Sequence, residues 1–339
     1  MFTPQYFMKQ WTSTGDNTRR IHITHYDLDG YGCIVMADEQ MDIVDEAKVP
    51  KDPHNAVNVF VTDYDEAKET IKKVCSLIDT IPDEDKVMVL ITDFSFKQDM
   101  IDVLCKKADM VLLIDHHQTC PLYDNISDKF MFIKDTSASA TYLTLYTQPH
   151  MWGDAFYNTF GASVSMYDLG DFGDWYNVES VDNLSYGLRL NLAFWHMMGH
   201  RGRKRPDTEP IIVNLIGYAM KIFGMQDNTF NPDTASAMPS INIAVANEWN
   251  RMRSEYSRYI RTMQAFRYPN MDLVGAIILD PKKNFFSIAK EIMKNHPEIP
   301  YMVGLYLNSM HFSICTIRED INVGQISKLV GGGGHPGAA

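Results

Sequence analysis

The amino-acid sequence predicts an α/β protein with a doubly wound, mostly parallel sheet, a helical connector and a second, smaller α/β domain. Between residues 21 and 147, short apolar runs alternate with longer amphipathic stretches, as in consecutive βαβ units. From about residue 137 to 265 the strand-like runs disappear, and strands return from Leu273. We therefore expect three parts, residues 1–190, 191–266 and 267–339.

Each expected element follows from the length and pattern of its apolar run. A short apolar run bounded by polar residues indicates a strand, and a longer amphipathic run indicates a helix. In the first part, strands are expected at Ile21–Thr24, Val57–Thr62, Val87–Thr92, Met110–Ile114 and Lys129–Ile133. The helices between them are expected at Gly32–Gln40, Asp65–Leu77 and Lys97–Lys107. In the last part, strands are expected at Leu273–Leu279, Tyr301–Tyr306 and His311–Ile317, with a helix at Phe285–Lys294.

Charge and composition limit the classes of partner. The 339 residues include 31 Lys and Arg against 43 Asp and Glu, a net charge of −12. This balance disfavours long duplex DNA and leaves a nucleotide substrate open. No apolar run approaches the roughly 18 residues of a membrane span, and the N-terminus lacks the pattern of a signal peptide. Five scattered cysteines without a CxxC pair indicate reduced thiols, so we expect a cytoplasmic protein without a membrane partner.

Three of the expected strands end in acidic residues or histidines. These are His25, Asp27 and Asp29, then Asp93, then Asp115, His116 and His117. The C-terminal ends of parallel strands meet at one edge of a sheet, and so many carboxylates need a cation there. Mixed imidazoles and carboxylates favour a first-row metal such as Mn²⁺ or Co²⁺ over Mg²⁺. Read alone, Asp93 is better explained as a helix N-cap; read together, the three strand ends favour metal.

This set of motifs resembles the DHH phosphoesterase superfamily. The matching residues are His25-x-Asp27-x-Asp29-Gly30, the strand-end Asp93 and Asp115-His116-His117. Near the C-terminus, Gly332-Gly-Gly-His335-Pro-Gly-Ala-Ala is similar to the GGGHxxAA signature of the DHH-associated C-terminal domain. Asp-His-His alone is a weak match, but the motifs occur in the family order from residue 25 to residue 339.

The resemblance implies two metal ions, usually Mn²⁺, with Co²⁺ or Mg²⁺ as alternatives. It implies that His25 and Asp27 hold one ion, that Asp29 and His116 hold the other, and that Asp93 bridges both. Asp115 would orient an imidazole, and His117 would face the scissile phosphate or the leaving group. The fourth motif would supply a further ligand to the second ion from Asp168, with Asp171 and Asp174 left open.

The glycine run near the C-terminus predicts a substrate-binding loop. Successive exposed backbone N–H groups form an anion-binding nest, whereas a flexible tail is the alternative. In the family this loop and a preceding arginine hold the terminal phosphate or base of the substrate. The corresponding residues are Arg318, Gly332, Gly333, Gly334 and His335, and a solvated strand end is the alternative for Arg318.

The function expected from these residues is that of a Mn²⁺-dependent phosphodiesterase. It would hydrolyse short single-stranded RNA or DNA, or dinucleotides, to mononucleotides, as in the nano-RNase branch, by a two-metal-activated water. A RecJ-like exonuclease would need a longer basic path, to which only Arg201–Arg205 points. A cyclic-dinucleotide phosphodiesterase and a nucleotide-binding module without catalysis remain alternatives, and a manganese pyrophosphatase ranks last. A homodimer is left open.

Overall fold

The protein forms two compact units, each described here by itself. The computed structural model describes residues 2–13, 17–38, 40–46, 48–123, 126–199, 206–225, 232–267, 273–282, 284–330, 332 and 337–339. The first unit comprises Met1–His116, Cys120–Asp168 and Tyr186–Ile241. The second comprises His117–Thr119, Leu169–Ser185 and Asn242–Ala339.

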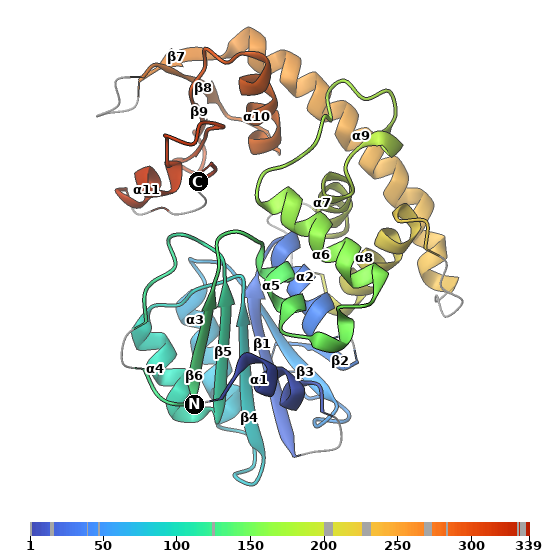
Figure 1. Ribbon diagram of the computed structural model, residues 1–339, viewed down its shortest axis with the longest axis vertical. Helices are drawn as coiled ribbons and strands as arrows, with labels where there is room; N and C mark the ends of the chain where they lie inside the picture. The colour runs from blue at the N-terminus through green and yellow to red at the C-terminus, as the bar shows by residue number, and fades with distance from the viewer. Residues whose placement is uncertain are drawn as a thin grey trace. The chain divides into compact units, whose positions relative to one another are not determined.

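The first unit is built on a six-stranded sheet in which all strands are parallel. Its strands are β1 (Thr18–His25), β2 (Asp42–Asp45), β3 (Ala56–Thr62), β4 (Lys86–Thr92), β5 (Met110–Asp115) and β6 (Phe130–Lys134). They lie in the order β2-β3-β1-β4-β5-β6, so the chain passes from one side of β1 to the other between β3 and β4 (Figure 1). Such a switch point is where open parallel sheets bind ligands. The predicted doubly wound sheet is confirmed.

The register of the strands brings their C-terminal ends to one edge. His25 lies opposite Thr62 of β3, and Thr24 lies opposite Thr92 of β4. Thr92 lies in turn opposite Ile114 of β5. The residues at and just beyond these positions therefore project from adjacent strands at the same edge of the sheet.

Helices cover both faces of this sheet, which explains the continuous apolar strands. On one face α3 (Ala67–Ile78) and α4 (Gln98–Lys107) pack against alternate residues of β1, β4 and β5 (Figure 1). On the other face lie α2 (Leu28–Ala37), α5 (Ala140–Tyr146) and the N-terminal α1 (Pro4–Trp11). All six residues of β5 are buried.

The middle of the chain is helical, as predicted. It contains α6 (Ala155–Asp168), α7 (Tyr186–Met197), α8 (Thr208–Ile222) and α9 (Pro232–Thr262), with short 3₁₀ turns at Pro149–Met151 and Val181–Asn183. Helix α9 runs from the first unit into the second. In the described part of the chain, no helix combines the length and the apolar character needed to cross a membrane.

The second unit contains a smaller, mixed sheet, which confirms the predicted second α/β region. Its strands are β7 (Gln264–Phe266), β8 (Gly275–Leu279), β9 (Met302–Tyr306) and β10 (His311–Cys315), in the order β10-β9-β8-β7. Strands β8 and β9 are parallel and are connected through α10 (Phe285–Asn295), whereas the outer pairs are antiparallel. The short helix α11 (Val323–Lys328) follows β10.

Candidate metal centre

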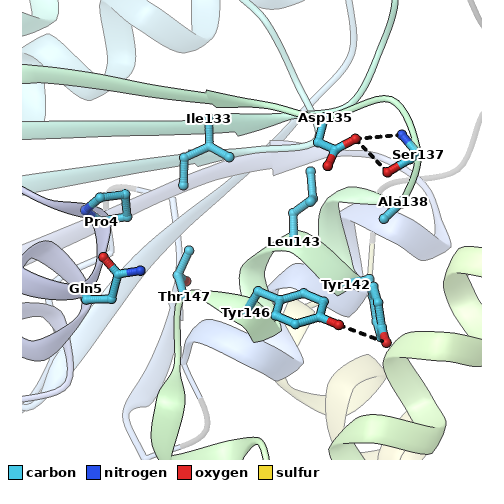
Figure 2. Close-up of a pocket in the computed structure, with 10 residues that line it drawn as sticks. All are labelled: Pro4, Gln5, Ile133, Asp135, Ser137, Ala138, Tyr142, Leu143, Tyr146 and Thr147. Carbon is cyan, nitrogen blue, oxygen red and sulfur yellow. Dashed lines mark hydrogen bonds between the residues drawn. The ribbon is translucent and has the colours of Figure 1, made fainter.

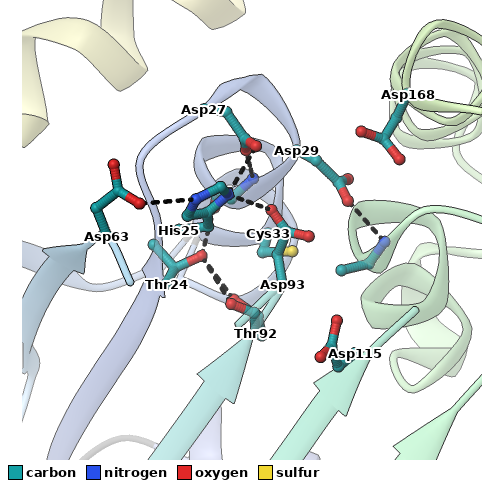
Figure 3. Close-up of polar contacts among 12 residues, drawn as sticks. Thr24, His25, Asp27, Asp29, Cys33, Asp63, Thr92, Asp93, Asp115 and Asp168 are labelled. Carbon is teal, nitrogen blue, oxygen red and sulfur yellow. Dashed lines mark hydrogen bonds and ion pairs between the residues drawn. The ribbon is translucent and has the colours of Figure 1, made fainter. Parts of the chain in front are cut away.

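The turn after β1 presents His25 and Asp27 together. Asp27 is the N-cap of α2: its Oδ1 accepts a hydrogen bond from Gly30 N at 2.9 Å. Its Oδ2 lies 2.8 Å from His25 Nδ1. A Cβ at position 30 would lie 2.2 Å from the carbonyl oxygen of His25, so only glycine allows this close turn. The sequence His-x-Asp-x-Asp-Gly therefore places an imidazole and a carboxylate side by side at the end of β1 (Figure 3).

Asp29, in the first turn of α2, is held by a helix that is distant in sequence. Its two carboxylate oxygens accept hydrogen bonds from Ala140 N and Thr141 N, at 2.8 and 2.9 Å, in the first turn of α5. The partial positive charge of a helix N-terminus favours a carboxylate there. Asp29 Oδ2 also lies 3.3 Å from His116 Nε2. Asp29 is thus fixed between α5 and the end of β5.

Asp93 follows β4 and faces both histidines. Its Oδ1 lies 3.1 Å from His116 Nε2, and its Oδ2 lies 3.7 Å from His25 Nδ1. The residue is 1% exposed and has a φ of 54°, a left-handed conformation that is uncommon outside glycine. Helix α4 begins only at Gln98, so Asp93 is not its N-cap. The backbone turns at Asp93 and directs one carboxylate between two imidazoles.

The end of β5 supplies Asp115, His116 and His117, all of them buried. Asp115 Oδ2 accepts a hydrogen bond from Ser95 Oγ at 2.6 Å, and its Oδ1 accepts one from His116 N at 2.7 Å. The Nε2 atom of His116 lies 3.5 Å from Asp168 Oδ2, at the last residue of α6. His117 follows His116 in the chain and is grouped with the second unit.

Within the first unit, these side chains form two groups of potential metal ligands. One ligand atom from each member lies within 4.8 Å of the others in the group. The first group is His25, Asp27 and Asp93; the second is Asp29, His116 and Asp168. Asp93 and His116 also come together with Asp115 on the same criterion. The nearby Asp171 and Asp174 accept hydrogen bonds from backbone N–H groups two and three residues further on.

The protonation behaviour of both groups indicates an excess of negative charge. Burial lowers the pKa of His25, but the neighbouring carboxylates, Asp27 first, outweigh burial and raise that pKa well above its ordinary value. Burial also lowers the pKa of His116, and Asp168, Asp93 and Asp29 together raise it well above the ordinary value.

The pKa of Asp93 is raised in the same sense. Burial has the largest effect, followed by the charges of Asp27 and Asp29. Each group of side chains thus favours an added positive charge. Divalent cations would supply that charge, and the mixture of imidazole and carboxylate donors suits Mn²⁺. The residues present therefore fit a pair of such ions.

Two further residues at this edge were missed by the sequence analysis. Asp63 follows β3, and its Oδ1 lies 3.7 Å from His25 Nε2 (Figure 3). The next residue, Tyr64, is 53% exposed, and its ring centre lies 5.6 Å from that of His25 and 4.7 Å from that of Phe94. The signal was present, because β3 ends in an acid just as β4 and β5 do.

Most of the predicted substrate-binding loop lies outside the described residues. This applies to Gly333, Gly334 and His335, and also to the basic stretch Arg201–Arg205. Gly332 is exposed, and its N–H donates to Ser327 O at 2.9 Å. Arg318 follows β10, and its Nε donates to Asp320 Oδ1 at 2.8 Å. The charge of Arg318 is therefore already balanced by a neighbouring carboxylate.

A separate hollow lies on the α1 and α5 side of the first unit. It has a volume of about 520 Å³ and is lined by residues of α1, the end of β6 and α5, including Asp135, Tyr142 and Tyr146 (Figure 2). None of the Asp and His residues of the two metal groups lines it. Its position does not change the assignment of the metal groups.

Comparison with known proteins gives similarity of fold only. No family model matches the sequence, and no curated protein matches it. An uncharacterized protein from Helicobacter pylori G27 is similar in structure, with a TM-score of 0.45 and 14% identity over 95% of this chain and 92% of that chain. The exonuclease RecJ bound to manganese is similar with a TM-score of 0.44 and 12% identity over 96% of this chain and 84% of that chain. The sequence motifs that resemble the DHH phosphoesterases supply all the residues of the two metal groups.

Proposed function

We propose that this protein is a metal-dependent phosphoesterase that hydrolyses phosphodiester bonds in short single-stranded oligonucleotides or dinucleotides. The observation that carries the proposal is the convergence of two Asp and His groups on Asp93. One oxygen of that carboxylate faces His25 and the other faces His116. A carboxylate with an imidazole on each side is well suited to link two divalent cations.

In this proposal, each group of side chains holds one Mn²⁺ ion. His25 and Asp27 bind one ion, Asp29, His116 and Asp168 bind the other, and Asp93 contributes to both. When bound, two such cations would supply Lewis acidity towards an attacking water and a phosphodiester oxygen. Asp115 does not need to bind a metal, because its two oxygens already accept hydrogen bonds from Ser95 and from the His116 backbone. Its role is to fix the turn that carries His116.

The remaining residues of the chain bind and orient the substrate. His117 donates a hydrogen bond to the scissile phosphate or to the leaving oxygen. The exposed ring of Tyr64, beside His25, offers a face on which a nucleobase can stack. Arg318, which is exposed beside its partner Asp320, and the Gly332–His335 loop bind a phosphate or a base of the substrate. The net charge of −12 supports a short substrate, since long polyanions would be repelled.

A turnover panel tests this proposal. Purified protein with Mn²⁺ is given RNA dinucleotides, DNA dinucleotides, longer single strands, cyclic dinucleotides and 3′-phosphoadenosine 5′-phosphate. We expect mononucleotide release to be fastest from the linear dinucleotides and to stop when Mn²⁺ is chelated. Faster turnover of longer strands would favour a RecJ-like exonuclease instead.

The Asp93→Ala variant tests the metal pair directly. Lewis acidity is worth several kcal/mol and about 1.4 kcal/mol is tenfold in rate, so we expect a loss of about a thousandfold or more. Circular dichroism checks that the fold is kept, and Asp83→Ala, in an exposed loop, is the matched control. Retained turnover in folded Asp93→Ala would rule out the two-ion proposal.

A further inference from the structure

His22 is a buried histidine of β1 that belongs to neither metal group. Its side chain is fully buried, and both ring nitrogens have partners. His22 Nδ1 lies 2.6 Å from Asp38 Oδ2, and His22 Nε2 lies 2.8 Å from Thr92 Oγ1. Asp38, at the end of α2, accepts a second hydrogen bond at Oδ1 from Trp11 Nε1 at 2.9 Å. A chain of polar contacts thus runs from α1 through β1 to β4.

The same chain continues to the edge of the sheet that carries the metal groups. Thr92 Oγ1 donates to Thr24 Oγ1 at 2.9 Å, and Thr24 Oγ1 donates to Gly30 O at 3.0 Å. Thr24 Oγ1 is also 3.2 Å from Thr92 O (Figure 3). Thr92 immediately precedes Asp93, and Thr24 immediately precedes His25. Thr92 and Thr24 are therefore each one peptide bond away from a proposed metal ligand. Gly30, where the chain of contacts ends, lies in the turn that Asp27 caps.

Each polar side chain of this chain of contacts has a partner. Trp11 Nε1 can only donate, so Asp38 Oδ1 accepts from it, and Asp38 Oδ2 pairs with His22 Nδ1. His22 Nε2 and Thr92 Oγ1 form the next contact, and Thr92 Oγ1 also lies 2.9 Å from Thr24 Oγ1. A buried chain of hydrogen bonds in which every member has a partner holds its members in one arrangement.

We infer that Trp11, Asp38 and His22 are positioning residues for the metal centre and act through Thr92 and Thr24. The inference rests on the proposed function, because it concerns the ions that function requires. Asp93 adopts a left-handed backbone directly after Thr92, so the end of β4 must be held in place where it turns. The Thr92 side chain provides that anchor, and His22 fixes the Thr92 side chain.

Simple core packing predicts a different outcome. If this chain of polar contacts only stabilises the fold, a substitution that breaks it lowers the melting temperature. The Mn²⁺ affinity of the folded protein is then unchanged. If it positions the ligands, the affinity falls even where the protein remains folded. Hydrogen bonds behind metal ligands typically contribute about 10- to 100-fold in affinity. Mn²⁺ affinity, measured by calorimetric titration of the full chain, therefore separates the two.

The first test compares Thr92→Val with Thr92→Ser. Valine has the shape of threonine but lacks the hydroxyl group, whereas serine keeps it. We expect Thr92→Val to bind Mn²⁺ about 10- to 100-fold more weakly and Thr92→Ser to bind close to the parent. The control is Thr147→Val, which removes a buried hydroxyl that donates to Thr144 O at 2.6 Å in the same unit. Its Mn²⁺ affinity should equal that of the parent.

The second test changes Asp38, which is two contacts away from Thr92. In Asp38→Asn, the amide oxygen still accepts from Trp11 and the amide nitrogen donates to His22 Nδ1, so His22 keeps a partner on both sides. In Asp38→Leu, His22 loses that partner altogether. We expect Asp38→Asn to keep the Mn²⁺ affinity and Asp38→Leu to lower it about tenfold. Rescue by the uncharged asparagine shows that orientation, not the charge of Asp38, is what the site needs.

The outcomes distinguish a failure of this inference from a failure of the proposed function. A parent protein that binds no Mn²⁺ overturns the proposed function, and the inference with it. A parent that binds Mn²⁺, with unchanged affinity in folded Thr92→Val, overturns the inference alone. If Thr92→Val does not fold, the Mn²⁺ affinity of Trp11→Phe is measured together with that of Asp38→Leu. Trp11→Phe removes one hydrogen-bond donor and keeps an aromatic ring. Unchanged affinity in both folded Asp38→Leu and Trp11→Phe then overturns the inference.

Discussion

The two metal groups of the first unit differ in how far water reaches them. In the first group the side chains of His25 and Asp27 are 18% and 32% exposed. In the second, those of His116 and Asp29 are 0% and 1% exposed, and only Asp168 reaches 20%. The first group is formed largely by one turn after β1, whereas the second is assembled from α2, β5 and α6.

This difference in exposure indicates that the two proposed ion sites have different roles. Residues of a buried group are held by distant elements and move little, so the second group is suited to hold its ion permanently. The first group borders Tyr64 and Asp63 and is open to solvent, so it is suited to meet the substrate. Asp93 belongs to the first group and reaches His116 of the second.

The largest expected effect comes from removing one imidazole at a time. Parent protein should bind two Mn²⁺ ions per chain, and His116→Asn and His25→Asn should each bind one. The remaining ion should be held tightly in His25→Asn, since the buried group is intact, and more weakly in His116→Asn. Calorimetric titration gives both the stoichiometry and the affinities.

The matched control for this pair is His150→Asn, an exposed histidine in the 3₁₀ turn after α5. It should bind two ions like the parent. Equal affinities for the remaining ion in the two test variants would contradict the division between an open and a buried group. Two ions in either variant would show that the altered histidine is not a ligand.

The open group was also the easier one to predict from sequence. The strands of a parallel sheet are buried on both faces and give continuous apolar runs, so β3 and β4 were located to within one residue at each end. His25 and Asp27 follow such a run directly. The start of α2 was predicted four residues late, because its N-cap Asp27 precedes two glycines that normally disfavour a helix.

The buried group depends on contacts that leave no local pattern. Asp29 accepts hydrogen bonds from Ala140 and Thr141 in the first turn of α5, which are 111 and 112 residues away in sequence. No sequence pattern near Asp29 predicts these partners. The choice among Asp168, Asp171 and Asp174 was open in the sequence, and the structure places Asp168 Oδ2 3.5 Å from His116 Nε2. Strand β2 was not predicted, because its four residues begin and end with aspartate and it pairs only with β3.

A medium effect is expected from the aromatic ring beside the open group. Stacking of a base on an aromatic side chain is worth about 1–3 kcal/mol, so Tyr64→Ala should raise KM for dinucleotides roughly 10- to 100-fold. Tyr64→Phe should leave KM close to the parent value, because the ring is retained. Steady-state kinetics with Mn²⁺ measures both.

The control is Tyr146→Ala, which removes an equally exposed tyrosine from the wall of the separate hollow. Its KM should not change. A fall in Mn²⁺ affinity in Tyr64→Ala would mean that the ring supports His25 instead of meeting a base. An unchanged KM in Tyr64→Ala would remove Tyr64 from the substrate site.

The smallest effect is a pH dependence of stability in the metal-free protein. The folded state raises the pKa of His25 and of His116 well above the ordinary value of 6.5. The folded state therefore binds these protons more tightly than the unfolded state, and their contribution is fully present below pH 6.5. That contribution is lost as the pH rises through the raised pKa values. The melting temperature after chelation should fall over this range, by about 2–4 °C for each kcal/mol lost.

Added Mn²⁺ and the two histidine variants test whether the pH dependence of stability comes from these two histidines. Saturating Mn²⁺ should remove most of the fall, because the ions take the place of the protons. Without metal, His116→Asn should flatten the pH dependence more than His25→Asn, since water screens the charges around the more exposed His25. Thermal unfolding across the pH range, with and without Mn²⁺, gives the comparison. Equal flattening by the two variants would mean that the difference in exposure has no electrostatic consequence.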